Sequence, residues 1–139
     1  MRAIAFHGAG GHAALLWPYA ALAARSGVHV VVPDLPGYGR TRVADRSAIR
    51  YPDWVALARD LVLAERAHHD GPLWLLGASV GGMLAYEAAT RTGAVDRLIA
   101  TCLLDPRDAE ARVVAARFPW MGRWSPQDLP PGWVSRCRG

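Results

Sequence analysis

Lysine is absent from the 139-residue chain, so all sixteen basic residues are arginine. Twelve acidic residues are interspersed with them, which leaves a formal net charge of +4. The densest basic stretch comprises Arg40, Arg42, Arg46 and Arg50. It could attract an acidic substrate, but we interpret it as a solvated loop. No nucleic-acid-binding module is recognisable, so no nucleic-acid partner is predicted.

Cysteine is scarce as well. Cys102 and Cys137 are the two cysteines, and neither belongs to a Cys-x-x-Cys motif. The sequence therefore indicates no disulfide framework and no cysteine metal site. No basic leader precedes a long apolar run, and glycine, proline and histidine interrupt the longest uncharged stretches. We predict a cytoplasmic protein with no membrane partner.

Ser79 is the first candidate for chemistry. It stands in Gly77-Ala78-Ser79-Val80-Gly81, after an apolar run and before small residues at helical spacing. A serine on a sharp turn between a strand and a helix is lifted clear of the sheet, which exposes its hydroxyl. Glycines are needed beside such a turn because the two backbones approach too closely for a Cβ. The pattern predicts Ser79 as a nucleophile.

A second glycine-rich segment, His7-Gly8-Ala9-Gly10-Gly11, follows the strand-like residues 3–6. Its open backbone N–H groups could bind the negative charge that develops on a carbonyl oxygen under attack. Such an oxyanion needs two donors, and we predict the N–H groups of Ala9 and Val80.

Apolar runs and helical spacing alternate along the first hundred residues. Alternation of this kind favours an α/β fold with a mostly parallel sheet of about four strands and flanking helices. The predicted strands are 2–6, 28–33, 73–77 and 98–104, and the predicted helices are 13–26, 52–69 and 80–91.

Three motifs in this order resemble the α/β-hydrolase family. Residues 7–10 resemble its oxyanion loop, residues 33–41 its loop after the next strand, and residues 77–82 its nucleophile elbow. The resemblance covers about residues 2–105. The family's strand order implies that the second strand lies outside the first, with the third and fourth on its other side. It implies an incomplete α/β-hydrolase sheet and a serine hydrolase acting on a small-molecule acyl substrate such as a carboxylic ester. No metal or organic cofactor is implied.

The family's catalytic order is serine, acid, histidine, whereas none of the five histidines here follows Ser79. Asp105, just past the fourth predicted strand, matches one position of the family's acid, with Asp108 as its near alternative. A cap or turn role for Asp105 is the stronger interpretation, because no histidine is there to be oriented. His7 is expected to hydrogen-bond the backbone, with a role as substitute base left open. We therefore expect the chain to be catalytically incomplete.

We divide the chain into a partial hydrolase core (1–105), the start of a lid (106–125) and an irregular tail (126–139). This organisation suggests the N-terminal part of an enzyme, left by a premature stop or a frameshift, with a natural short homologue as the alternative. Four strands alone would leave both sheet edges uncovered, so self-association is expected. Pocket or lid walls are predicted at His7, Gly8, Gly10, Tyr38 and Trp120.

Two other classes of function remain open. Residues 8–13 also read as G-x-G-x-x-A, and Asp34 ends the next predicted strand, as in a dinucleotide-binding Rossmann domain. That interpretation leaves residues 77–82 unexplained, and the Tyr-x-x-x-Lys pair of many Rossmann reductases is impossible without lysine. The third class is a degenerate hydrolase that binds a ligand without turning it over.

Overall fold

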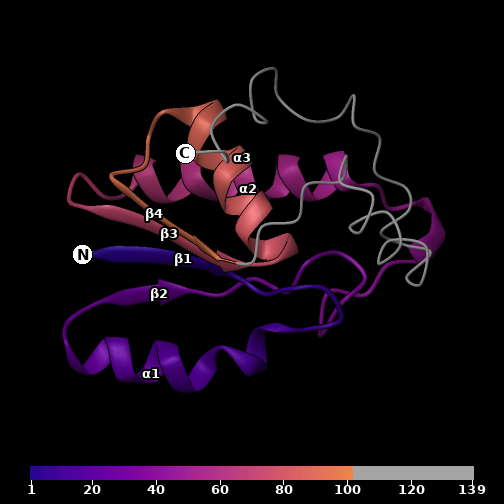
Figure 1. Cartoon of the computed structure of the whole chain (residues 1–139), viewed down its shortest axis with the longest axis horizontal. Helices are drawn as coiled ribbons and strands as arrows, with labels where there is room; N and C mark the ends of the chain where they lie inside the picture. Colours follow the sequence, from indigo (N-terminus) through magenta and orange to yellow (C-terminus); the bar gives the residue numbers. More distant parts are fainter. Residues whose placement is uncertain (102–139) are drawn as a thin grey trace.

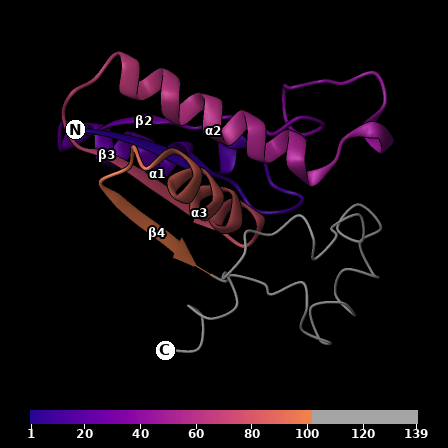
Figure 2. The same cartoon turned by 90° about the horizontal axis from the view of Figure 1, so that it is seen from above.

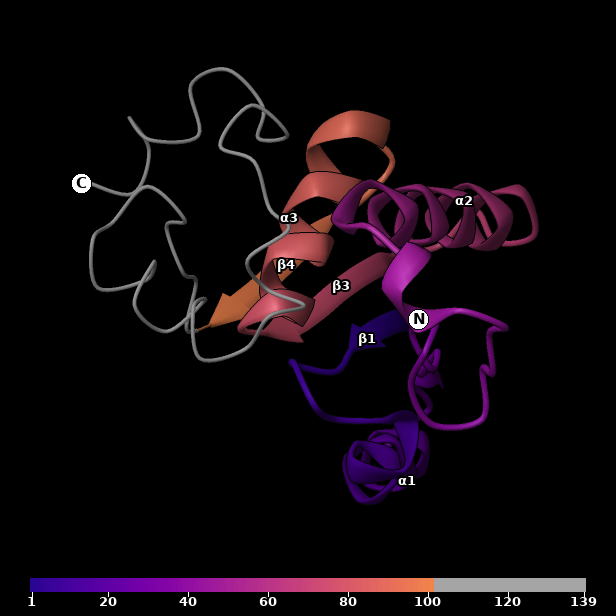
Figure 3. The same ribbon diagram turned by 90° about the vertical axis from the view of Figure 1, so that its right-hand side faces the viewer.

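The computed structural model describes residues 1–101. Its centre is a parallel four-stranded sheet in the order β2-β1-β3-β4, as the sequence predicts. One helix lies on one face of the sheet and two helices lie on the other (Figures 1 and 3). The predicted lid and tail lie outside the described residues.

The strands are β1 (Arg2–Phe6), β2 (His29–Val31), β3 (Leu73–Ala78) and β4 (Arg97–Thr101). The α-helices are α1 (Trp17–Arg25), α2 (Tyr51–Ala67) and α3 (Val80–Thr92), and two short 3₁₀ turns are η1 (Ala13–Leu15) and η2 (Arg46–Ala48). The predicted elements are therefore present, with shifted ends.

The largest shift concerns the first helix, which was expected to begin at residue 13. Residues 13–15 instead form the turn η1, and α1 begins at Trp17 with Pro18 in its first turn. Proline has no N–H to give to the preceding turn, so it is favoured where a helix starts and interrupts a longer one. At the other end Gly27, with φ of +75°, follows the helix as predicted.

The hydrophobic core lies between the sheet and the pair α2 and α3, whose packing is seen from above in Figure 2. Ile4, Leu75 and Leu84 are fully buried there. The opposite face differs, because α1 has no buried residue and packs beside β2. Trp17, Tyr19 and Leu22 of this helix are all more than half exposed.

Two glycines allow α3 to start close to the sheet. A Cβ added to Gly77 would lie 2.2 Å from the carbonyl oxygen of Gly81. A Cβ added to Gly81 would lie 2.2 Å from the carbonyl oxygen of Phe6. Real side chains do not approach a backbone oxygen so closely, so glycine is required at both positions, as the sequence predicts. This close packing fixes the position of the residue between them, Ser79.

Candidate active site

Ser79 joins the end of β3 to the start of α3. Its backbone has φ of 55° and ψ of −125°, and it is the one non-glycine residue with positive φ within residues 1–101. Its N–H donates to the carbonyl oxygen of Thr101 at 2.8 Å, and its own carbonyl accepts from Met83 at 3.0 Å. An L-residue held in this region costs about 1–3 kcal/mol, and such strain is concentrated at functional sites. The strained backbone predicted for Ser79 is present.

The glycine-rich segment after β1 lies directly against this turn. A Cβ added to Gly8 would be 3.3 Å from the carbonyl oxygen of Ala78 and 3.7 Å from the Cβ of Ser79. Gly11 donates to the carbonyl of Gly8 at 3.1 Å, which closes the segment into a turn with Gly10 at φ of +72°. Within residues 1–101, the N–H groups of Ala9 and Val80 donate no backbone hydrogen bond. The segment that contains Ala9 therefore lies against the turn of Ser79, and Val80 directly follows Ser79 in the chain.

Ser79→Gly is expected to be more stable than Ser79→Ala by about 1 kcal/mol. Alanine retains the strain of positive φ, whereas glycine removes it and gives back part of the gain as added freedom of the unfolded chain. Urea unfolding of the two variants measures the difference. Equal stability, or a less stable glycine variant, would show that the backbone at this position is unstrained.

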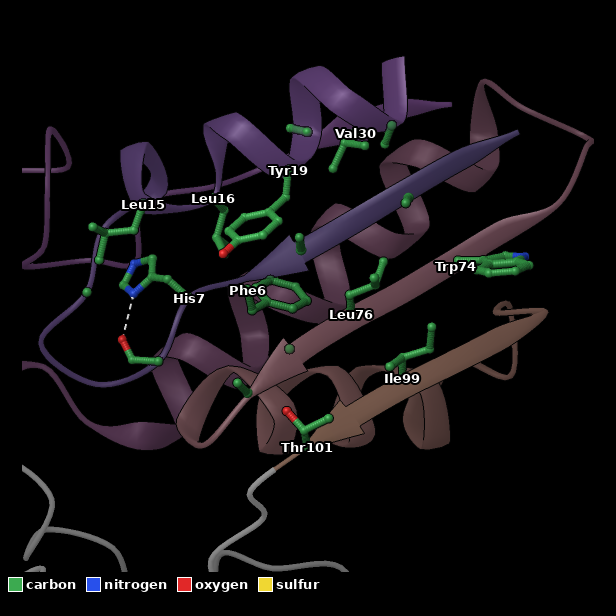
Figure 4. A pocket seen from close by; sticks show the side chains of 18 of the residues that line it. Phe6, His7, Leu15, Leu16, Tyr19, Val30, Trp74, Leu76, Ile99 and Thr101 are labelled. Atoms are coloured by element: carbon green, nitrogen blue, oxygen red, sulfur yellow. Dashed lines mark hydrogen bonds between the residues drawn. The ribbon is translucent and has the colours of Figure 1, made fainter. Parts of the chain in front are cut away.

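His7, at the end of β1, is buried and uses both ring nitrogens. Nε2 accepts a hydrogen bond from the backbone N–H of Leu35 at 3.1 Å, so it carries no hydrogen. Nδ1 therefore carries the ring proton and donates to the carbonyl of Gly8 at 2.8 Å (Figure 4). Burial lowers the pKa of His7, which keeps the ring neutral. The backbone role expected for His7 is confirmed, and neither nitrogen is free to take a proton from Ser79.

Asp34 fastens two loops together at the carboxyl end of the sheet. Its carboxylate accepts from the N–H of Ala13 at 2.6 Å and from the N–H of Arg40 at 2.8 Å. These backbone hydrogen bonds lower its pKa. Gly39 packs against the same carboxylate, where an added Cβ would lie 2.1 Å from Oδ1. The carboxylate has a structural role in its loop, which argues against its use in binding a ribose.

Tyr38 was expected to line a substrate pocket. Its ring packs between two others, with centroids 5.6 Å from His7 and 5.8 Å from Trp54, both edge-on. The buried Trp54 donates from its indole nitrogen to the carbonyl of Pro36 at 3.2 Å. The Tyr38 ring therefore packs against the His7 ring.

A cavity of about 780 Å³ runs along the sheet face that carries α1. Tyr19 of α1 and Leu16, just before the helix, border it on one side, and Leu76 and Ile99 border it from the strands (Figure 4). Among the predicted site residues, those in contact with the cavity are His7, Gly8, Ala9 and Gly10. Ser79, Val80 and Tyr38 do not border it, so the cavity lies beside the serine turn rather than over it.

Asp105, Asp108 and Trp120 lie outside the described residues. Within residues 1–101, no group of three His, Cys, Asp or Glu side chains could hold a metal ion. In the same part of the chain, every helix is too short or too polar to cross a membrane.

Two contacts at this end of the sheet have no signal in the sequence. The bond from Ser79 to the Thr101 carbonyl depends on the register of β4, in which Thr101 pairs with Ala78. The guanidinium of Arg46 lies over the Tyr38 ring, 5.0 Å from its centre. Both contacts join residues that only the folded chain brings together.

Comparison with known proteins agrees with this architecture. A model of the alpha/beta hydrolase family matches residues 3–138. Protein phosphatase methylesterase 1 of Bos taurus is 32% identical over 101 residues, which are 71% of this chain and 26% of that protein. The chain therefore spans about a quarter of the length of the curated relatives that it matches.

Two solved structures illustrate the similarity in three dimensions. The RedJ thioesterase from the prodiginine biosynthetic pathway in Streptomyces coelicolor is 26% identical, with a TM-score of 0.56 over 98% of this chain and 57% of that one. An extracellular α/β-hydrolase from a Paenibacillus species has a TM-score of 0.65 at 19% identity, over 84% of this chain and 50% of that one. The second match shows the fold alone.

The fold, the strained strand-to-helix turn and the family match together define this chain as a member of the α/β-hydrolase family. The predicted family and the predicted incomplete, mostly parallel sheet are confirmed. The family match also removes the reason for a dinucleotide-binding interpretation of residues 8–13.

Proposed function

We propose that the protein is a serine hydrolase of the ester or thioester class, with Ser79 as the nucleophile. The observation that carries this proposal is the strained turn of Ser79 against the Gly8 segment. Attack of Oγ on a substrate carbonyl would form a new C–O bond and place negative charge on the carbonyl oxygen. The N–H groups of Ala9 and Val80 would stabilise that charge, and loss of the alcohol or thiol would leave an acyl-enzyme for water to cleave.

As the new C–O bond forms, the proton of the serine hydroxyl must be removed and delivered to the departing alcohol or thiol, which is the task of a catalytic base. Within residues 1–101, no histidine nitrogen accepts a hydrogen bond from Ser79, and His7 is committed to Leu35 and Gly8. Asp105 remains a proposed acid. A protein of this class that lacks its base retains only about 10³-fold to 10⁴-fold acceleration over water.

A fluorophosphonate tests the role of Ser79 directly. Oγ forms a bond to phosphorus, the P–F bond breaks, and the serine proton passes to water while fluoride leaves without needing a proton. The negative charge that develops on the P=O oxygen would be stabilised by the two N–H donors. We expect slow stoichiometric modification at Ser79, located by peptide mass spectrometry. Ser26 and Ser47 are internal controls of the same residue type, and Ser79→Ala is the external control. Modification spread equally over the three serines would disprove the proposal.

The 139-residue chain is expected to hydrolyse p-nitrophenyl acetate no more than about twofold faster than its Ser79→Ala variant. A serine without a base stays protonated at neutral pH, and the remaining acceleration by the N–H donors is largely shared by the variant. The measurement is release of p-nitrophenol, helped by the absence of the lysine amines that react with activated esters.

A Ser79-dependent rate far above that limit would show that another group acts as the base. His7→Ala would then test whether the ring leaves its backbone partners during the reaction. Binding without turnover is the second candidate function, favoured by the engaged His7 ring. A chain in which Ser79 resists the fluorophosphonate would support it.

A further inference from the structure

The loop between β2 and α2 carries four arginines at the carboxyl end of the sheet (Figure 1). All four side chains are exposed: Arg40, Arg42, Arg46 and Arg50. Within residues 1–101, none of them forms an ion pair with a carboxylate. The sequence alone predicts a solvated loop, but one of the four is held differently from the others.

The side chain of Arg46 packs against the backbone of Gly37 and the ring of Tyr38. A Cβ added to Gly37 would be 3.3 Å from Nε and 3.5 Å from Cγ of Arg46, so the missing side chain of Gly37 makes room for the arginine stem. The guanidinium carbon then lies 5.0 Å from the centre of the Tyr38 ring. Contacts with His7 and Trp54 fix that ring in turn. Arg46 is therefore an exposed arginine whose orientation is set by packing.

Arg46 is also a side-chain hydrogen-bond partner of Tyr38, which orients the guanidinium further and leaves its remaining N–H donors for a ligand. Those donors form a planar fork that matches the two oxygens of a carboxylate or of a phosphate. A fork already held in place loses less side-chain freedom when it binds than a mobile arginine does. The three neighbouring arginines show no comparable ring contact within the described residues.

The position of Arg46 relates it to the proposed active site. The Tyr38 ring separates Arg46 from His7, and His7 precedes the Gly8 segment that lies against Ser79. The Gly10 backbone is also a hydrogen-bond partner of Tyr38. An anion held by Arg46 would thus be connected to the Ser79 turn through Tyr38, His7 and the Gly8 segment.

We propose that Arg46 binds a carboxylate or phosphate carried by the acyl substrate, at a distance from the scissile carbonyl. This inference rests on the proposed function for its meaning, but anion binding can be measured without catalysis. The substrate class is then an ester or thioester with an anionic group elsewhere in the molecule.

The experiment titrates the ¹⁵N-labelled 139-residue chain and follows the arginine Nε–Hε signals by NMR. The probes are monomethyl glutarate, neutral dimethyl glutarate and inorganic phosphate. We expect saturable shifts of the Arg46 signal with monomethyl glutarate and none with the dimethyl ester. Saturation by phosphate as well would extend the site to phosphorylated substrates, whereas saturation by neither anion would overturn the proposal.

Matched variants test whether anion binding depends on the oriented guanidinium of Arg46 or only on the positive charge of the loop. Arg46→Gln should weaken binding of monomethyl glutarate about tenfold, and Arg46→Lys should weaken it severalfold because lysine keeps the charge and loses the fork. Arg42→Gln removes an equally exposed charge from the same loop and should change binding less than about twofold. Equal losses in all three variants would show that only net charge matters.

The two proposals fail separately. Modification of Ser79 by the fluorophosphonate does not depend on an anionic substrate group, so it should persist in Arg46→Gln. Lost anion binding with intact Ser79 modification would reject the role of Arg46 alone. Anion binding with unreactive Ser79 would reject the proposed hydrolase instead.

Discussion

Val80→Pro is expected to slow the modification of Ser79 by a fluorophosphonate about a hundredfold. Proline removes the backbone N–H that we propose as an oxyanion donor, and loss of one such donor costs about 10²-fold to 10³-fold in worked cases. Val80 is the first residue of α3, where the N–H has no helical partner, so proline there costs the helix no hydrogen bond. The rate of adduct formation, measured by intact mass, checks the prediction.

Val80→Ala is the matched control, because it loses the buried side chain and keeps the N–H. It should react within a few-fold of the unchanged protein. If the proline and alanine variants react at the same rate, the Val80 N–H takes no part. Thermal unfolding of both variants shows whether the turn is intact.

Gly81→Ala is expected to destabilise the fold by about 3 kcal/mol or more, and Gly10→Ala by about 1 kcal/mol. At Gly81 the new Cβ would lie 2.2 Å from the Phe6 carbonyl oxygen, so α3 must move away from β1. That cost exceeds the gain of about 1 kcal/mol that alanine brings to a helix. At Gly10 nothing lies within 4 Å, and the cost is that of the positive φ.

Urea unfolding of the two alanine variants measures this difference. A Gly81→Ala protein as stable as Gly10→Ala would mean that α3 is not pressed against the end of β1. The proposed position of Ser79 beside the Gly8 segment would then lose its structural basis.

Local patterns predicted the fold well because each carries its own physical cause. The glycines at 77 and 81 indicated a close backbone approach, and the structure shows both approaches. Alternating strands and helices predicted the parallel sheet, and the resemblance to the family predicted its strand order. The predicted start of the first helix was wrong. The apolar pattern of residues 13–26 favours one long helix, but Pro18 interrupts it and α1 begins at Trp17.

The candidate site was only partly predictable. Ser79 and its strained backbone follow from a local motif, whereas the partners of His7 and the ring contacts of Tyr38 depend on how β1 and the loop after β2 meet. Of the four arginines in the loop after β2, Arg46 packs against its neighbours, because Gly37 has no side chain to occupy the same space. Sequence spacing carries no information on such contacts between distant residues.

The neutral ring of His7 makes the shape of this region depend on acidity. Protonation would give Nε2 a hydrogen directed at the Leu35 N–H, and two donors would then oppose each other in a buried space. Burial lowers the pKa of His7 below the unfolded value near 6.5, and the loss of the bond from Leu35 would act in the same direction. Stability from this residue is therefore full above about pH 6.5 and declines below it, as the unfolded chain gains the proton more readily. A ring that cannot serve Ser79 as a base thus acts as an acid-sensitive link between two strand ends.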